Sequence, residues 1–143
     1  MIAFDTNILF PSLEPSHSNH QRARDFLQQI KGKEVALCEL VLMETYLLVR
    51  NPAVCTRPLD GPDAVALMRG LRSNPQWRLL DYPGALMDDI WEAARQPGFA
   101  RRRIFDARLA ITLRSHGVTD FATANVKDFE GFGFAKVWKP FLT

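Results

Sequence analysis

The stretch Met1-Ile2-Ala3-Phe4-Asp5-Thr6-Asn7 decides the fold, because it joins a short apolar run directly to polar residues that favour a helix start. Residues 2–4 predict a buried strand, and a helix is expected from around Asn7. The carboxylate of Asp5 then lies at the carboxyl end of that strand. The same order, a short apolar run followed by a helical segment, recurs along the chain.

Four further apolar runs predict strands, and five further segments have the spacing of helices. The expected strands are residues 35–37, 77–81, 121–123 and 136–138. The expected helices are residues 17–31, 39–50, 63–72, 85–95 and 103–116, and proline or glycine follows most of them, including Gly117 as a helix C′ residue. Alternating strands and helices indicate an α/β fold. We expect one domain over residues 1–143, with a parallel sheet of four or five strands sandwiched by helices.

Length and composition agree with a single globular domain. The chain has 143 residues, 47% hydrophobic and 24% charged, which is ordinary for a soluble protein. The net charge of +2 is small, so affinity for an anionic polymer needs a local basic patch. We expect a cytoplasmic protein, because no apolar run approaches the roughly 20 residues of a membrane helix and no signal peptide is recognisable.

Glu44 is the most informative acidic residue. Its neighbours at helical spacing, three and four residues away, are all apolar: Leu40, Val41, Leu47 and Leu48. A carboxylate on an apolar face is costly to bury without a partner. A buried salt bridge to an arginine is one explanation, and a metal site is the one we favour.

Other oxygen-bearing side chains are expected at the same edge of the sheet. Asp106 opens the helix before the fourth strand, and Thr123, Asn125 and Asp128 follow that strand. Each has a simpler explanation alone: Asp5 as a helix cap, Asp106 as a charge favoured at a helix N-terminus, Asn125 and Asp128 as turn residues. Ligands of open parallel sheets bind beyond the carboxyl ends of the strands, where these residues would meet.

An all-oxygen ligand set suits Mg²⁺, with Mn²⁺ as a substitute, rather than zinc. The two cysteines lack metal-ligand spacing, and the three histidines do not form an alternative site. Basic residues that could hold a phosphodiester backbone lie beside the acids, namely Arg101, Arg102, Arg103 and Lys127.

Four segments together resemble the PIN-domain ribonucleases of the VapC toxin type. They are Met1-Ile2-Ala3-Phe4-Asp5-Thr6-Asn7, Leu40-Val41-Leu42-Met43-Glu44 continuing to Asn51-Pro52, Phe105-Asp106-Ala107-Arg108-Leu109-Ala110, and Thr123-Ala124-Asn125-Val126-Lys127-Asp128-Phe129. The resemblance runs nearly end to end and implies a PIN-like domain over residues 1–143. It also implies Mg²⁺-dependent cleavage of tRNA or rRNA loops, inhibition by a cognate antitoxin, and homodimerisation.

The resemblance also distributes roles among the residues. Asp5 and Asp106 would bind the metal, Glu44 would position or deprotonate water, and Asn125 and Asp128 would complete the metal shell. Thr6 and Thr123 would orient these ligands. The family's fourth acid is replaced here by the neutral Asn125. Two other functions are therefore also considered: a non-catalytic RNA- or partner-binding domain, and a phosphatase with Asp5 as nucleophile, which Asn7 disfavours by standing where a second aspartate is needed.

Overall fold

The computed structural model describes residues 1–141 and contains one five-stranded sheet. The strands are β1 (Ile2–Phe4), β2 (Val35–Cys38), β3 (Trp77–Leu80), β4 (Asp120–Ala122) and β5 (Lys136–Trp138). Their order across the sheet is β3-β2-β1-β4-β5, and every neighbouring pair is parallel. The predicted α/β fold with a parallel sheet is confirmed, and all five expected strands form.

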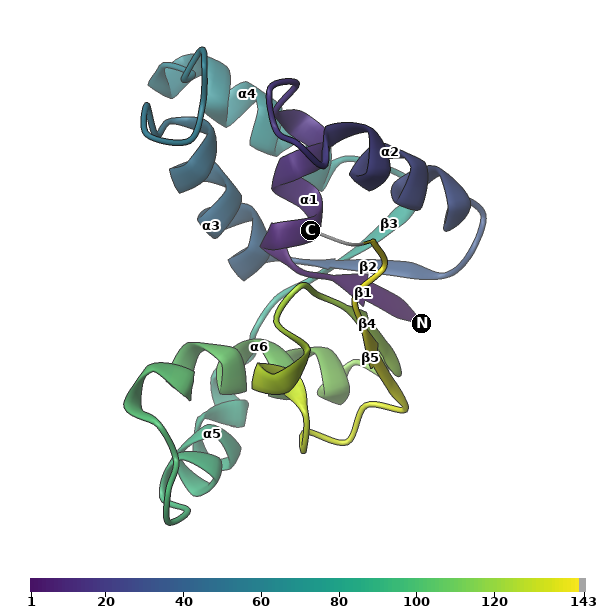
Figure 1. Ribbon diagram of the computed structural model, residues 1–143. Coiled ribbons are helices and arrows are strands. Elements are labelled where there is room, and N and C mark those ends of the chain that lie inside the picture. Colours follow the sequence, from purple (N-terminus) through teal and green to yellow (C-terminus); the bar gives the residue numbers. More distant parts are fainter. Residues whose placement is uncertain (142–143) are drawn as a thin grey trace.

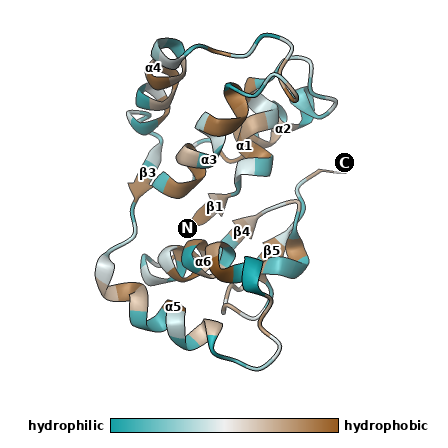
Figure 2. Ribbon diagram, turned by 90° about the vertical axis from the view of Figure 1, so that its left-hand side faces the viewer, coloured by the Kyte–Doolittle hydropathy of each residue, from teal (hydrophilic) through white to brown (hydrophobic). Residues whose placement is uncertain are grey.

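Helices cover both faces of the sheet. They are α1 (Thr6–Leu13), α2 (His20–Gln29), α3 (Glu39–Val49), α4 (Gly61–Arg72), α5 (Met87–Ala94) and α6 (Ile104–Ser115). Three short 3₁₀ turns accompany them: η1 (Gly84–Leu86), η2 (Arg101–Arg103) and η3 (Val126–Phe129). Figure 1 shows α1 to α4 on one side of the sheet and α5 and α6 on the other. The hydrophobic residues gather in the strands and in α1 and α3 (Figure 2).

Local hydrogen bonds shift several helix boundaries from those expected. Helix α1 begins at Thr6 because the Asp5 side chain accepts a hydrogen bond from the Thr6 backbone N–H at 2.8 Å. Helix α2 begins at His20 rather than at residue 17, since His17 Nδ1 accepts from the Asn19 backbone N–H at 3.0 Å and the chain turns there. Helix α6 ends at Ser115, and Gly117, with a φ of +86° that suits glycine, follows it as the expected C′ residue.

The core extends beyond the sheet into the segment that follows β4. The ring of Phe121 on β4 lies edge-on to Phe129 with centroids 4.7 Å apart, and stacks on Phe134 at 5.4 Å. Phe121 and Phe129 are both fully buried. This packing holds η3 and the residues after it against the sheet edge where the candidate site lies. None of the helices in residues 1–141 is long and apolar enough to span a bilayer.

Candidate active site

A polar cavity of about 260 Å³ opens at the carboxyl ends of β1 and β4. Three acidic side chains from separate elements line it: Asp5 after β1, Glu44 on α3 and Asp106 on α6. The other lining residues are Thr6, Asn7, Leu48, Phe105, Leu109 and Asn125. The fold therefore brings together acids that stand 39 and 62 positions apart in the sequence, all within one hollow.

Asp5 is both a helix cap and the buried acid of this cavity. Its Oδ1 accepts from the Thr6 backbone N–H, and its Oδ2 accepts from the Thr123 hydroxyl at 2.7 Å. Burial raises the pKa of the Asp5 carboxyl to about 6, against the lowering effect of these hydrogen bonds, and repulsion from Glu44 and Asp106 adds to the rise. The Asp5 carboxylate thus both caps α1 and lines the cavity.

Glu44 is partly buried at the edge of the cavity, and its Oε2 accepts a hydrogen bond from the Thr6 hydroxyl at 2.8 Å. The ion pairs found among residues 1–141 are Arg72–Glu39 and Arg95–Glu92, so the buried salt bridge considered for Glu44 is not observed there. Two of its apolar helix neighbours differ in burial, since Val41 is buried whereas Leu47 is 67% exposed. The apolar residues around Glu44 on α3 therefore lie partly in the core and partly on the protein surface.

Asp106 lies in the first turn of α6 and is partly buried in the cavity wall. Burial raises the pKa of its carboxyl, as do the charges of Asp128 and Glu44, whereas Arg103 lowers it. The structure does place Asp106 at a helix N-terminus, where an acid is favoured, and the same position also lines the cavity with the other two acids. Ionised together, the three carboxylates repel one another.

The two candidates for a fourth ligand differ in position. Asn125 lines the cavity, and its side chain makes no capping hydrogen bond to η3. Asp128 is exposed and does not line the cavity, although its charge reaches Asp106. Its backbone N–H closes the turn by donating to the Asn125 carbonyl at 3.1 Å. The backbone makes this turn without needing the Asn125 side chain.

Asn7 also lines this cavity, although the sequence did not single it out as a ligand. Its Nδ2 donates to Asp5 Oδ2 and to Thr123 Oγ1, both at 3.4 Å, and its Oδ1 accepts from the Ala124 backbone N–H at 3.0 Å. The amide therefore joins the ends of β1 and β4 across more than a hundred positions of sequence. Its place two residues after Asp5, in the first turn of the helix, is the signal that could have found it.

The four basic residues predicted to hold the RNA backbone, which we call the basic rim, differ in their exposure to solvent. Arg101, Arg102 and Lys127 are exposed. Arg103 is partly buried, and its guanidinium contacts aromatic rings and a backbone carbonyl. Arg108, beside Asp106 in sequence, lies 4.3 Å above the Tyr82 ring and does not line the acid cavity.

The donor set of this cavity fits a hard divalent cation. Carboxylate, amide and hydroxyl oxygens line it, and a bound cation would offset the burial and the nearby carboxylates that raise the pKa of Asp5. Within residues 1–141, no three acidic, histidine or cysteine side chains approach closely enough to ligate one ion directly. Mg²⁺ does not need three, because it keeps several waters and binds through one or two carboxylates. Asp5 and Asp106 are the residues that would hold it.

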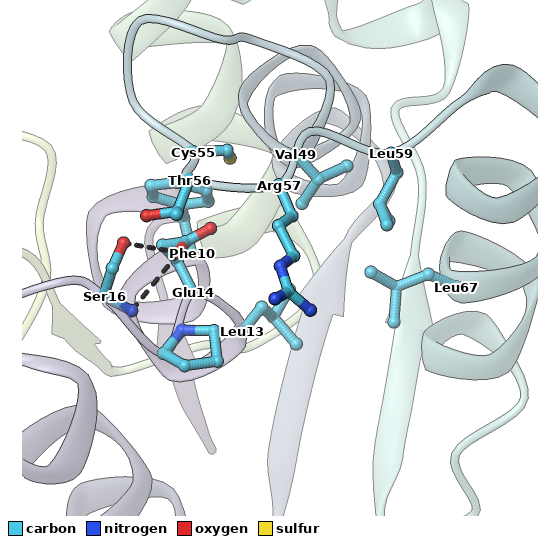
Figure 3. Close-up of a pocket in the computed structure, with 11 residues that line it drawn as sticks. Phe10, Leu13, Glu14, Ser16, Val49, Cys55, Thr56, Arg57, Leu59 and Leu67 are labelled. Atoms are coloured by element: carbon cyan, nitrogen blue, oxygen red, sulfur yellow. Dashed lines mark hydrogen bonds between the residues drawn. The ribbon is translucent and has the colours of Figure 1, made fainter.

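A second cavity, of about 410 Å³, lies where the C-terminal ends of α1 and α3 meet the 52–60 loop (Figure 3). Hydrogen bonds from the Ser16 side chain and backbone, at 2.6 and 3.2 Å, lower the pKa of the Glu14 carboxyl. Burial and the nearby Glu14 raise the pKa of the Cys55 thiol to about 11. A protonated thiol is a poor nucleophile, so Cys55 does not give this cavity a reactive cysteine.

The whole sequence is similar to curated ribonucleases. Ribonuclease VapC24 of Mycobacterium tuberculosis, in strains CDC 1551 and H37Rv, is 49% identical over 141 residues, which cover 98% of this chain and 97% of that protein. The chain matches no family model.

Solved structures share the fold at lower identity. Mycobacterium tuberculosis VapC20, described as a sarcin–ricin loop cleaving toxin, has a TM-score of 0.66 and 19% identity, with 85% of this chain and 87% of that chain covered. FitAcB from Neisseria gonorrhoeae has a TM-score of 0.67 and 24% identity over 98% of both chains. FitAB bound to a DNA fragment has a TM-score of 0.68 and 21% identity, covering 100% and 98%. On the full-length match to VapC24, and with this fold, the chain belongs to the VapC family of PIN-domain ribonuclease toxins.

Proposed function

We propose that this VapC-family ribonuclease is a Mg²⁺-dependent endoribonuclease that hydrolyses structured RNA, in tRNA or rRNA loops, as the toxin of a type II toxin–antitoxin pair. The observation that carries the proposal is the convergence of Asp5, Glu44 and Asp106 on one cavity in a chain 49% identical to a ribonuclease. The identity of the RNA would depend on loop shape and contacts with the rim.

The residues divide the work by position. Asp5 and Asp106 would hold the cation, which supplies charge neutralisation at the phosphate and a lowered water pKa. Glu44, which is less buried than Asp5, orients the attacking water and accepts its proton. Thr123 fixes the rotamer of Asp5, and Thr6 fixes that of Glu44.

The metal requirement is tested by cleavage of a tRNA and rRNA mixture with and without EDTA. We expect EDTA to lower cleavage at least about 100-fold, and Mg²⁺ or Mn²⁺ to restore it. Mg²⁺ at about 100 times its Kd should also stabilise the fold by about 2.7 kcal/mol, because it binds only the folded acid cluster. The Asp5→Asn protein, purified in parallel, controls for a contaminating nuclease. Undiminished cleavage in EDTA would show that the reaction needs no metal.

Asn125→Asp is expected to lower the Mg²⁺ concentration needed for half-maximal cleavage, because it adds a full negative charge to the cavity wall. Asp128→Asn should shift the curve less and in the opposite direction, since Asp128 lies outside the cavity that Asn125 lines. Cleavage measured against Mg²⁺ concentration for both variants separates the two positions. An unshifted curve for Asn125→Asp with a strong loss for Asp128→Asn would assign the fourth ligand to Asp128.

Two protein partners belong to the proposal, a cognate antitoxin and a second copy of the chain. An apolar surface between α3 and α4, bordered by Phe105 of α6, supports the first, with exposed Met43, Leu47 and Val65. Apolar patches of this kind mark protein interfaces. Glu44 and Phe105 line both this surface and the acid cavity, so a chain bound here would reach the site. Co-purification with the product of a neighbouring small reading frame tests the antitoxin, and the molecular mass of the purified chain tests the dimer.

A further inference from the structure

The side chain of Arg103 joins two segments that border the acid cavity. Its guanidinium carbon lies 5.6 Å from the centroid of the Phe99 ring and 5.4 Å from that of Phe132. Its Nη2 donates to the backbone carbonyl of Asp128, in η3, at 3.0 Å. Arg103 itself is the last residue of η2, directly before α6. One side chain thus links the start of α6 to the segment after β4.

These contacts distinguish Arg103 from its neighbours in the arginine run. Arg101 and Arg102 are exposed, whereas Arg103 is partly buried. Its Nε is fully buried and has no hydrogen-bond partner within residues 1–141. Leaving a donor buried in this way is costly, and the two aromatic rings and the carbonyl are what hold the group there. The Arg103 guanidinium is therefore engaged in contacts within the protein, while Arg101 and Arg102 are accessible to an anionic ligand.

The segments that Arg103 joins carry the two sides of the candidate metal shell. Asp106 lies in the first turn of α6, and Asn125 directly precedes η3. Phe129 anchors one end of η3 in the core, but Phe132 lies between two glycines with positive φ, Gly131 and Gly133. Those glycines give the segment a flexible backbone that a side-chain contact can fix.

We propose that Arg103 is a positioning residue. Its side chain holds η3 and Phe132 against the start of α6, a set of contacts that we call the latch, and thereby sets the separation of Asn125 from Asp106. The inference rests on the proposed function, in which these residues share one metal shell. It removes Arg103 from the RNA-binding rim and leaves Arg101, Arg102 and Lys127 as the basic residues that contact RNA.

Lysine cannot replace arginine in this latch. The planar guanidinium stacks on rings and donates in a fixed direction, whereas the ammonium group is a compact point charge that is strongly hydrated. Arg103→Lys keeps the positive charge near Asp106 and near RNA but loses the paired ring contacts. A role in binding phosphate predicts that lysine substitutes well, and a role as a latch predicts that it does not.

Steady-state cleavage separates the two roles. Arg103→Ala and Arg103→Lys are both expected to lower kcat about 10-fold to 100-fold with little change in KM, because a small misplacement of the reacting groups has effects of this size. Arg101→Ala is expected to raise KM instead. A rise in KM for Arg103→Ala, rescued by Arg103→Lys, would overturn the latch and return Arg103 to the rim.

RNA binding at increasing salt gives a second comparison. For a single-stranded RNA oligonucleotide in EDTA, Arg101→Ala should reduce the slope of log K against log salt by about 0.7, the value for one lost phosphate contact. Arg103→Ala should leave the slope as in the wild type. An equal reduction in both variants would contradict the assignment of Arg103 to the protein interior.

Amide hydrogen exchange tests the latch without any reference to RNA or metal. Arg103→Ala is expected to speed exchange at residues 126–132, and Arg95→Ala, which alters an exposed arginine paired with Glu92 on α5, should not. If exchange is unchanged in Arg103→Ala, the latch does not exist. If exchange rises but kcat is kept, the latch does not position the site, while the proposed function stands on the EDTA experiment.

Coupling to Phe132 completes the test. Phe132→Leu keeps an apolar side chain but removes the ring that Arg103 contacts. If both residues form one latch, the loss of kcat in the double variant should be smaller than the product of the two single losses. Losses that multiply would mean that the residues act independently and would overturn the shared role.

Discussion

Asp5→Asn is expected to abolish RNA cleavage, with a loss of at least about 100-fold, while the fold is kept. The variant removes the buried carboxylate that would hold the cation, but its amide oxygen can still accept from the Thr6 backbone N–H and so cap α1. Its amide nitrogen replaces Oδ2, so the hydrogen bond that Oδ2 accepts from Thr123 is lost, at a cost of about 1 kcal/mol. The loss of cleavage should therefore come without loss of structure.

The stability of this variant should depend on pH in a defined way. The Asp5 carboxyl has a pKa of about 6 in the folded chain and 3.8 as its ordinary value. Ionised Asp5 therefore opposes folding, by an amount that grows as pH rises from about 4 through 6 and is fully present at pH 7. A difference of about two units corresponds to about 3 kcal/mol. Without metal, Asp5→Asn should be more stable than the wild type at pH 7, and this advantage should vanish near pH 4.

Urea unfolding of both metal-free proteins at pH 4 and pH 7, together with RNA cleavage in Mg²⁺, measures these effects. Mg²⁺ should remove the stability advantage of Asp5→Asn at pH 7 by binding only the wild type. Cleavage near the wild-type rate would refute the assignment of Asp5 to the metal site. A variant less stable than the wild type at pH 7 would mean that the hydrogen bonds of Oδ2 outweigh the cost of burying the charge.

Glu44→Gln is expected to lower kcat about 10²-fold to 10⁴-fold, the range for removal of a general base, with a smaller effect on RNA affinity. The stability of the metal-free protein should stay within about 0.5 kcal/mol of the wild type or rise. Glutamine keeps an oxygen that can accept from the Thr6 hydroxyl, and it ends the repulsion between Glu44 and Asp5. Unfolding and cleavage are therefore expected to respond in different directions.

Glu92→Gln is the matched control for this change, because Glu92 is an exposed helical glutamate outside the cavity that pairs only with Arg95 in the described ion pairs. It should leave cleavage at the wild-type rate. A destabilisation of Glu44→Gln by more than about 2 kcal/mol would indicate a charge pair that the structure does not contain, since breaking a buried pair costs about 3–5 kcal/mol. Normal cleavage by Glu44→Gln would exclude Glu44 as the base.

The sequence alone was sufficient for the architecture, because strands and helices are marked by local patterns. The apolar runs at residues 2–4 and 35–37 and the glycine at Gly117 lie where the structure has β1, β2 and the end of α6. Parallel pairing follows from the alternation of strand and helix, and parallel pairing predicts that Asp5 and Asn125 emerge at one edge of the sheet. The predicted helix starts were less accurate. Helix α2 begins three residues later than expected because the hydrogen bond from the Asn19 N–H to His17 Nδ1 competes with the helix at that point.

Which polar residues meet at that edge was decided by the tertiary structure. The bonds of Asn7 to Thr123 and Ala124 join residues 116 and 117 positions apart, and no local pattern specifies such a pair. The same holds for the arginine run, in which three adjacent residues look alike in sequence. Packing against Phe99 and Phe132 takes Arg103 out of solvent and leaves Arg101 and Arg102 exposed. Sequence fixes the chemistry of a side chain, but its surroundings come from distant segments that only folding brings into contact.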